Sequence, residues 1–518
     1  MGGTEAVALR TWLGFLAMCL GMFMAILDIQ IVASSLPEIQ AALHIPVHWL
    51  SWVQTAYLIA EIIAIPLTGC LTRMLSLGGL FIAATAGFTL ASTGCAQSGG
   101  FAALVAWRVV QGFCGGLIIP AVFTSVFELF PRAAQIRATT IAGIFAMLAP
   151  TLGPAFGGFI TETYSWHWLF LINVGPGIVA CAVAAVALRT GGGDWSLLRR
   201  FDYPSLALLT LCLASLEIAL KEGPPRGWSD PLVLVLCLLC VVTTGLLIRR
   251  SISRDAPLVR LTLFSDRGFC VSCLYSFVLG AGLYGSVYLL SIFLGFVRNH
   301  TPLEIGTIML VSGGAQLIAA PVAANLERRF NRRWLTFIGY GLFGGGLLLN
   351  ANATYETDFA GLFWPQLLRG AGVMFCLLPT TSLALETQPQ DRVADASGLF
   401  NLMRNLGGAI GIALIDTILE MRVPAHVAQL VERLQAGDPV AALAVGLPVE
   451  RFHNLPMANV DDATKELIRP LIERAALVAS FNDAYLMLGV AFVLALLLLP
   501  LLRPAPAHVP RIHFVEGI

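Results

Sequence analysis

The sequence has little charge for its length. Only 12% of its 518 residues are Asp, Glu, Lys or Arg, against roughly 25% in a typical soluble domain. Hydrophobic residues make up 57%, and the mean hydropathy is +0.81. An excess of either sign is also absent, because 31 basic and 31 acidic residues give a formal net charge of zero. This composition excludes a soluble globular protein, leaves no general attraction to nucleic acid, and predicts a polytopic membrane protein.

Groups of residues that would hold a metal or carry out catalysis are also scarce. The eleven cysteines lie almost wholly in apolar stretches. The pairs Cys237/Cys240 and Cys270/Cys273 have a metal-like spacing but no His or carboxylate beside them, so we interpret them as small core residues. We find no nucleophile or metal constellation that would face one leaflet. The sequence therefore predicts no metal, no cofactor and no enzyme activity.

Apolar windows of about 20 residues, the length of a membrane-spanning helix, follow one another along the chain. The windows are residues 12–36, 49–69, 78–97, 100–121, 138–161, 166–188, 203–220, 231–249, 268–293, 304–324, 334–352, 360–384, 396–420 and 483–502. We therefore predict an all-α polytopic membrane protein with 14 transmembrane helices. Residues 1–11 lack the features of a separate signal peptide, so the first window is expected to be an uncleaved span.

The basic residues predict the orientation of these spans. Most of them fall on the side of the N-terminus, and the short loops opposite hold only Lys221, Arg226 and Arg298. Short loops follow the positive-inside rule, so both termini are predicted to be cytoplasmic. The long segment 421–482 would lie outside, with helix-compatible patterns at Val427–Leu434, Ala441–Leu447 and Asp462–Ala479.

The chain contains an internal repeat. Residues 60–73 align without gaps to residues 315–328, 255 positions later, and share Ala, Ile, Ala, Pro, Leu and Arg. At an offset of 258, the matching pairs are Gly112 and Gly370, Pro131 and Pro389, Ala138 and Ala396, and Gly153 and Gly411. Both copies enter the membrane in the same direction. Parallel repeats of this kind place a substrate site between two six-helix halves near the bilayer midplane.

The repeat also predicts the domain organisation. Residues 1–190 would form an N-terminal six-helix half, and residues 191–260 an inserted pair of helices. Residues 261–518 would form the C-terminal six-helix half, with an extracytoplasmic loop at about 421–482.

A carboxylate inside a membrane span costs free energy, so its presence indicates a function. Asp28 interrupts the apolar sequence of the first span, and Glu61 lies near the middle of the second, with Gln54 and Tyr57 on about the same face. Burial disfavours the charged form of a carboxylate, so Glu61 is a candidate to bind and release a proton. Asp28 could instead cap a helix end.

Arginine and amide side chains extend this set. Arg108 starts a stripe with Gln111 in the fourth span, and could be structural if Asp28 or backbone carbonyls neutralise it. Arg369 occupies the position of Gln111 in the repeat, and could contact substrate or the other half. The thirteenth span carries a polar arc that should face the interior, formed by Asn401, Arg404, Asn405, Gly408 and Asp416.

Two acids lie nearer the outer surface. Simple hydration is the preferred interpretation for Glu217, whereas hydration and proton coupling are both open for Asp416. The candidates for proton coupling are therefore Asp28, Glu61 and Asp416, with Arg108 as charge partner.

Residues 149–158 carry two prolines and three glycines between apolar stretches of one span. In a soluble helix each Pro would cost about 3 kcal/mol and each Gly about 1 kcal/mol. Lipid forces a span to stay helical, and helix breakers survive only where neighbours or a cavity satisfy the backbone. We therefore predict a bent, close-packing helix, with its glycines at the interface of the halves. The residues concerned are Pro150, Gly153, Pro154, Gly157 and Gly158.

Three motifs together resemble the fourteen-span drug:proton antiporter branch of the major facilitator superfamily, and most closely its EmrB-type multidrug exporters. Leu27–Pro37 is similar to the first-span signature, Arg108–Gly112 to the fourth-span motif, and Ala149–Gly158 to the fifth-span antiporter motif. Tyr164–Val174 and Trp364–Gln366 strengthen the resemblance. The loop at 69–76 departs from the superfamily pattern, because the acid and the second glycine are missing, which argues against a charge-relay gate there.

The resemblance implies a major facilitator fold and proton-coupled efflux of amphiphilic toxic compounds or drugs by alternating access. It implies a bacterial inner membrane, with the proton gradient in place of a cofactor. It also implies a periplasmic adaptor and an outer-membrane channel that would meet segment 421–482, although a cap without a partner is equally open. The residues alone support only a partly apolar cargo with polar groups.

Other functions stay open at this point. A proton-coupled or facilitated transporter of a specific metabolite or siderophore would share the fold, and the fifth-span motif argues against import. A membrane enzyme would need the catalytic constellation that is missing. A receptor would need no buried titratable groups.

Overall fold

A computed structural model describes residues 7–50, 52–188, 193, 202–254, 257–327, 329–385, 388–389, 392–447 and 462–502. All regular secondary structure in these ranges is helical. Ten of the helices are long and apolar enough to cross a membrane, judged by length and composition. Each window expected from the sequence falls on helical segments, which confirms the all-α membrane class, whereas the total of 14 spans stays a prediction.

The N-terminal part of the chain forms a first group of helices. Its elements are α1 Leu9–Ser34, α2 Leu36–Leu43, α3 Val47–Leu50, α4 Trp52–Ala64, η1 Ile65–Leu67, α5 Thr68–Leu75, α6 Leu77–Ala96, α7 Phe101–Leu129, α8 Arg132–Thr163, α9 Trp168–Leu171 and α10 Val174–Ala187. Within the group, α1 packs against α8 and α10, and α7 packs against α4 and α6. Phe15, Phe81 and Phe88 are fully buried in its apolar core.

The C-terminal part forms a second group. Its elements are η2 Leu261–Ser265, α14 Arg267–Ile292, the π-helical η3 Phe293–Val297, α15 Pro302–Glu327, α16 Arg332–Asn350, α17 Phe359–Leu385, α18 Val393–Gln435, α19 Pro439–Val445, α21 Asp462–Leu496 and η6 Leu499–Leu501. Here α14 packs on α18, and α17 packs on α15 and α16. The two groups meet chiefly where α8 contacts α15 and where α4 contacts α18.

The groups use the same close contact at matching glycines. A Cβ added to Gly112 of α7 would collide with the backbone of Tyr57 of α4, and one added to Gly370 of α17 would collide with the backbone of Ser312 of α15. Tyr57 and Ser312 are themselves separated by the repeat offset of 255 positions. The internal repeat therefore corresponds to equivalent helix packing in the two groups.

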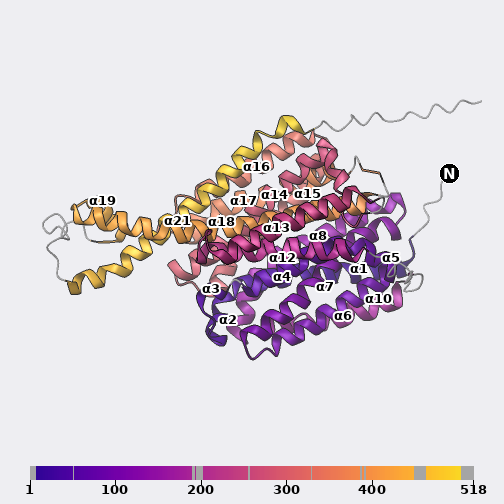
Figure 1. The fold of residues 1–518 in the computed structure, drawn as a ribbon, viewed down its shortest axis with the longest axis horizontal. Helices are drawn as coiled ribbons and strands as arrows, with labels where there is room; N and C mark the ends of the chain where they lie inside the picture. The colour runs from indigo at the N-terminus through magenta and orange to yellow at the C-terminus, as the bar shows by residue number, and fades with distance from the viewer. Residues whose placement is uncertain are drawn as a thin grey trace, which may run out of the picture.

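Helices α12 (Tyr203–Arg226) and α13 (Pro231–Ile252) form a separate pair. They pack on each other, and α12 also contacts α4 of the first group and α18 of the second, so the pair lies across the boundary between the groups (Figure 1). On α13, Leu238 and Val241 are well exposed, as expected for a helix with one side towards lipid. The predicted boundary at 190 and 191 lies outside the described residues.

The long helices α18 and α21 continue beyond the bundle as an arm, which we define as the described part of residues 421–482 (Figure 1). The arm begins as a helix, because α18 runs unbroken to Gln435 with Pro424 inside it. The extracytoplasmic position of residues 421–482 stays a prediction. Gly437 has a φ of 75°, the left-handed region that suits glycine, and the chain turns there into α19. The arm has its own apolar core, which includes Leu434, Ala441 and Ile472. It lies at the end of the bundle opposite the N-terminus, which we call the arm end.

Candidate functional site

A buried polar network surrounds Asp28 of α1. Arg108 Nη1 forms an ion pair with Asp28 Oδ2. Asp28 Oδ1 accepts hydrogen bonds from Gln111 Nε2 and Asn173 Nδ2, each at 2.8 Å. Gln111 Nε2 also lies 2.9 Å from the hydroxyl of Ser92. These side chains are fully buried, so both oxygens of the Asp28 carboxylate are satisfied inside the first group.

Arg108 is held from several further sides. Its Nε donates to the carbonyl oxygen of Val53 at 2.9 Å, and its guanidinium lies 4.4 Å from the centre of the Tyr57 ring, a cation–π contact. Asp28 stands six residues before the end of α1, so it does not cap that helix. Removing one partner of such a buried pair costs about 3–5 kcal/mol, because the other charge is then left buried alone.

Glu61 lies on α4 at the contact between the two groups. Its side chain is 2% exposed, and its Oε2 has no hydrogen-bond partner among the described residues. Arg404 and Asn405 of α18, across the contact, act on it electrostatically, as does Arg108. Tyr284 of α14 joins them, because its hydroxyl donates to Asn405 Oδ1 at 3.3 Å. A titratable group with a free oxygen therefore lies between the groups and beside a cation.

The residues of the predicted polar arc of α18 lie in two separate regions, one beside α4 and one nearer the arm. Beside the contact with α4, Arg404 Nη2 donates to Asn401 Oδ1. Asp416, about three turns further towards the arm, accepts a hydrogen bond from the Tyr288 hydroxyl at 2.6 Å and lies 3.9 Å from Lys221 Nζ of α12. The side chain of Asp416 is 18% exposed, so protons can reach it more readily than they reach the middle of the bundle.

The remaining cavity candidates are scattered. Tyr57 and Gln111 belong to the buried network of the first group, and Gln54 is half-buried on α4. Arg369 of α17 is 3% exposed, and its Nη2 donates to Gln366 Oε1 at 2.6 Å within the second group. These contacts do not bring Arg369 to the junction where Glu61 lies.

The proline-glycine run forms part of α8, an uninterrupted helix. Gly153 packs against Gln30 of α1, whereas the backbone of Pro154 and Ala155 meets Gly306 of α15. The prediction that Gly153 lies at the interface of the halves is therefore wrong. The missing side chain brings α1 close within the first group, and the neighbouring residues make the contact with the second. Of the other motif residues, Gly157 and Gly158 are buried, and the side chain of Pro150 lies outside the described ones.

Glu217 of α12 is buried, in contrast to the hydrated position predicted from the sequence. It is 3% exposed, and its Oε1 has no partner within the part of the chain that the structure describes. It belongs to a stripe with a spacing of four residues, together with Leu209, Leu213 and Lys221. The two leucines pack into an apolar cluster with Ile62 of α4 and residues of α18. That spacing was visible in the sequence and could have identified Glu217 as facing the junction of the groups.

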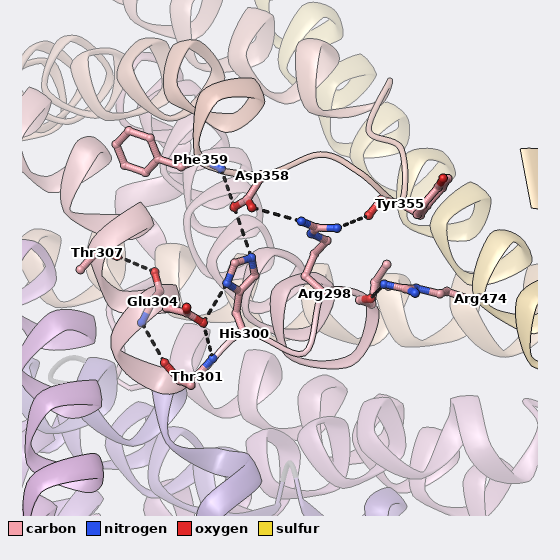
Figure 2. Close-up of polar contacts among 10 residues, drawn as sticks. Arg298, His300, Thr301, Glu304, Thr307, Tyr355, Asp358, Phe359 and Arg474 are labelled. Carbon is pink, nitrogen blue, oxygen red and sulfur yellow. Dashed lines mark hydrogen bonds and ion pairs between the residues drawn. The ribbon is translucent and has the colours of Figure 1, made fainter. Parts of the chain in front are cut away.

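A second polar cluster joins the ends of α14, α15 and α17 at the arm end (Figure 2). Arg298 Nη2 lies 3.1 Å from Asp358 Oδ2, and Arg298 Nη1 donates to the Tyr355 carbonyl oxygen at 2.8 Å. His300 lies between two carboxylates: its Nδ1 is 3.0 Å from Glu304 Oε2, and its Nε2 is 3.2 Å from Asp358 Oδ1 without a well-aligned hydrogen bond. This cluster ties together connections that the sequence indicated only as loops.

The described residues include no group of three or more His, Cys, Asp or Glu side chains that could hold a metal ion. Cys237 and Cys240 are half-buried free thiols, and Cys240 Sγ lies 4.0 Å from a threonine hydroxyl. Cys273 is buried and Cys270 is exposed.

Comparison with known families agrees with this architecture. The family model described as Major Facilitator Superfamily matches residues 18–412, well over half of the chain. The chain belongs to the major facilitator superfamily. Members of this superfamily are membrane transporters, so the protein is a transporter with a polytopic helical fold.

Individual relatives show which members of the superfamily the chain resembles. The "Colistin resistance protein EmrB" of Acinetobacter baumannii is 38% identical over 492 residues, which cover 95% of this chain and 96% of that protein. The "Multidrug export protein EmrB" of Escherichia coli K12 is 31% identical over 82% of this chain and 83% of the relative. The resemblance to EmrB-type proteins is thereby confirmed. A crystal structure of a bacterial homologue of the human lysosomal transporter Spinster, inward-facing and unoccupied, has a TM-score of 0.59 at 13% identity over 98% of this chain and all of that one.

Proposed function

We propose that this transporter exports amphiphilic toxic compounds or drugs across the inner membrane, that a proton gradient drives it, and that it works by alternating access. Two relatives support the cargo, because their names refer to multidrug export and to colistin resistance. The observation that carries the proton coupling is Glu61, a buried carboxylate with a free oxygen at the junction of the two groups.

Glu61 suits the role of proton carrier better than Asp28. Two amide donors and a guanidinium saturate the Asp28 carboxylate, so a proton there would have to disrupt the network. Glu61 has an unpartnered oxygen that can take a proton without breaking a hydrogen bond. We assign to the Asp28–Arg108 pair a positioning role that holds α1 and α7 together, and we place Asp416 on the outer side as an entry point for protons.

Proton and cargo would compete at Glu61. When Glu61 is ionised, it attracts the cationic part of an amphiphilic substrate, and Arg404 across the junction prevents the charge from standing alone. A proton that arrives from outside neutralises Glu61 and removes that attraction. Because the groups meet at this residue, its change of charge also changes the interaction between α4 and α18. Release of cargo and binding of a proton are then mutually exclusive.

The same proposal sets the orientation. Both termini are cytoplasmic, and the arm lies in the periplasm of a double-membraned bacterium. The arm would contact a periplasmic adaptor that leads to an outer-membrane channel. Its separate apolar core supports this assignment, because an extension with its own core can present a surface away from the lipid.

Uptake of a fluorescent toxic cation into inside-out vesicles tests the proposal. With a proton gradient, the wild type should accumulate the dye, and an uncoupler should abolish accumulation. Glu61→Gln should remove the proton-driven part while the protein stays folded. Glu356→Gln, a change at an exposed acid, is the matched control and should transport normally. Uptake that the uncoupler does not reduce would disprove the antiport mechanism. Full activity of Glu61→Gln would show that Glu61 does not couple proton movement to transport. Proton-driven movement in the opposite direction would indicate an importer.

A further inference from the structure

The core of the second group contains a buried cation for which the described ranges supply no anionic partner. Arg369 of α17 is 3% exposed, and its Nη1 has no hydrogen-bond partner among the residues that the structure describes. Among the described residues no carboxylate forms an ion pair with it, and Tyr485 is the titratable group that acts on it. A charge buried alone is costly, and proteins pair such charges. A negative charge bound beside this guanidinium would therefore stabilise the folded protein.

Side chains on α16, α17 and α21 add further unpaired polar atoms, most of them donors. Gln366 Nε2, the Tyr485 hydroxyl and both amide atoms of Asn350 have no partner in the described part of the chain. These three side chains are 0%, 2% and 2% exposed, respectively. Helix α16, which carries Asn350, packs on α17 and on α21. One turn before Asn350, the absent side chain of Gly346 brings α16 against the backbone of Arg369. Buried polar groups on three helices that pack together, one of which carries the cation, therefore lack partners in the described part of the chain.

The first group shows that the missing partner is a carboxylate. At the repeat offset of 258, Arg108 and Gln111 of α7 match Gln366 and Arg369 of α17, so the arginine and the glutamine have changed places. In the first group, Asp28 accepts from both of these side chains. The second group keeps the arginine and the amide but pairs them with no carboxylate in the described ranges.

The matching helix of the second group places a leucine at that position. Helices α1 and α14 correspond through the contact of Gly153 with Gln30 and that of Gly411 with Ala281. Two residues before these contact residues, α1 carries its carboxylate and α14 carries Leu279. Leu279 is 1% exposed in the core of the second group. The second group therefore contains the cation, with an apolar side chain at the position that holds the counter-ion in the first group.

We propose that a small monovalent anion such as chloride binds among Asn350, Gln366, Arg369 and Tyr485, and supplies the charge that Asp28 provides in the first group. The site favours a small ion, because all four side chains are almost completely buried and leave no access for a large or amphiphilic anion. An anion that binds only the folded state stabilises it by mass action. The site depends neither on proton coupling nor on the direction of transport.

The first test uses the purified full chain in detergent. At constant ionic strength, replacing gluconate by chloride should raise the Tm of the wild type by about 2 °C or more, and radiolabelled chloride should bind saturably. Arg369→Gln should lose both effects. Equal Tm values in the two salts, without saturable chloride binding, would overturn the proposal. Saturable binding that survives in Arg369→Gln would also overturn it, because the anion would then lie elsewhere.

A second pair of variants covers the case in which Arg369→Gln does not fold. Leu279→Asp places a carboxylate where the first group has one, so its Tm should no longer depend on chloride. Leu279→Asn changes size and polarity similarly but adds no charge, and should keep the dependence. Identical chloride responses of the two variants would contradict a role for the anion as the missing counter-ion.

Discussion

Asp28, Glu61 and Glu217 are buried carboxylates with different partners. Asp28 is paired with a guanidinium and accepts two amide hydrogen bonds, whereas Glu61 and Glu217 each keep one oxygen without a partner among the described residues. Pairing offsets the cost of burying a charge, whereas an unpaired buried charge costs free energy. The protein retains two such costly groups where α4, α12 and α18 meet, which is the distribution expected if they serve transport rather than folding.

Isosteric amide substitutions should separate these roles. Asp28→Asn leaves Arg108 buried without its counter-ion, so we expect a loss of about 3 kcal/mol or more in stability. Glu217→Gln removes a charge that has a free oxygen, so we expect no loss of stability and slower proton-driven transport. Thermal unfolding of the purified variants, with transport measured in vesicles, checks both. A clear drop in Tm for Glu217→Gln would mean that Glu217 has a stabilising partner.

Whole helices meet at positions where a side chain is missing. Gly306 of α15 faces the backbone of Pro154 and Ala155 of α8, and this contact joins the first group to the second. Close contacts of this kind permit small shifts between helices, because the two backbones touch with no side chain between them. The contact is therefore a suitable place for the relative movement that alternating access requires.

A methyl group at this position should disturb the contact. In Gly306→Ala the new Cβ would lie 2.5 Å from the Pro154 carbonyl oxygen, so α8 and α15 must separate, at a cost of about 1–3 kcal/mol. Gly314→Ala on the same helix is the control, because nothing lies within 4 Å of its added Cβ; it should be neutral. Thermal unfolding and dye transport of both variants check this. Equal behaviour of the two would show that the α8–α15 contact is not tight.

Electrostatics at the arm end should produce a measurable pH dependence. The backbone N–H of Phe359, together with Arg298, holds the pKa of Asp358 below its ordinary value. A lowered pKa stabilises the folded state above the unfolded value of about 3.9, and this contribution is lost as the pH falls through the folded pKa. The side chain is 45% exposed, so we expect at most about 1 kcal/mol.

A comparison of wild type with Asp358→Asn measures the contribution of the Asp358 charge to stability. The variant should be less stable near neutral pH, and the difference should shrink as the pH falls through the lowered pKa of Asp358, with Glu356→Gln as the control for a general change of charge. A difference in Tm that persists unchanged in acid would assign the effect of Asp358 to packing instead of charge.

The helices could be predicted from the sequence because each span needs a long apolar window. The partners of the polar residues could not, because they depend on how helices rotate and pack. Asn401 and Asp416 share one arc of α18, yet one lies near α4 and the other pairs with Tyr288. Gly153 indicated a close contact correctly, but the sequence could not say that the partner is α1. The depth of Glu217 along its span suggested water, whereas lateral packing of α12 buries it.

At the scale of the whole molecule, the inserted pair connects both groups at the arm end. On α12, Glu222 accepts a hydrogen bond from Trp52 of α4 at 3.3 Å, and Lys221 lies 3.9 Å from Asp416 of α18. Just beyond α12, Trp228 donates to Thr417 of α18 at 3.3 Å. These contacts place α12 across the junction on the side where protons would enter. Any movement of the two groups at this end must therefore rearrange contacts of the inserted helix.

The arm, by contrast, is held mainly by its own core, so its function should be separable from transport. Leu434 is fully buried there, and Leu434→Asp places a charge in an apolar cluster, which should unfold the arm. If the arm binds an adaptor, cells with this variant should become as drug-sensitive as cells without the protein, while dye uptake into inside-out vesicles stays normal. Leu434→Met preserves the core and should keep resistance. Unchanged resistance of Leu434→Asp would exclude the arm as the adaptor site, and equal loss in both assays would make the arm part of the transport unit itself.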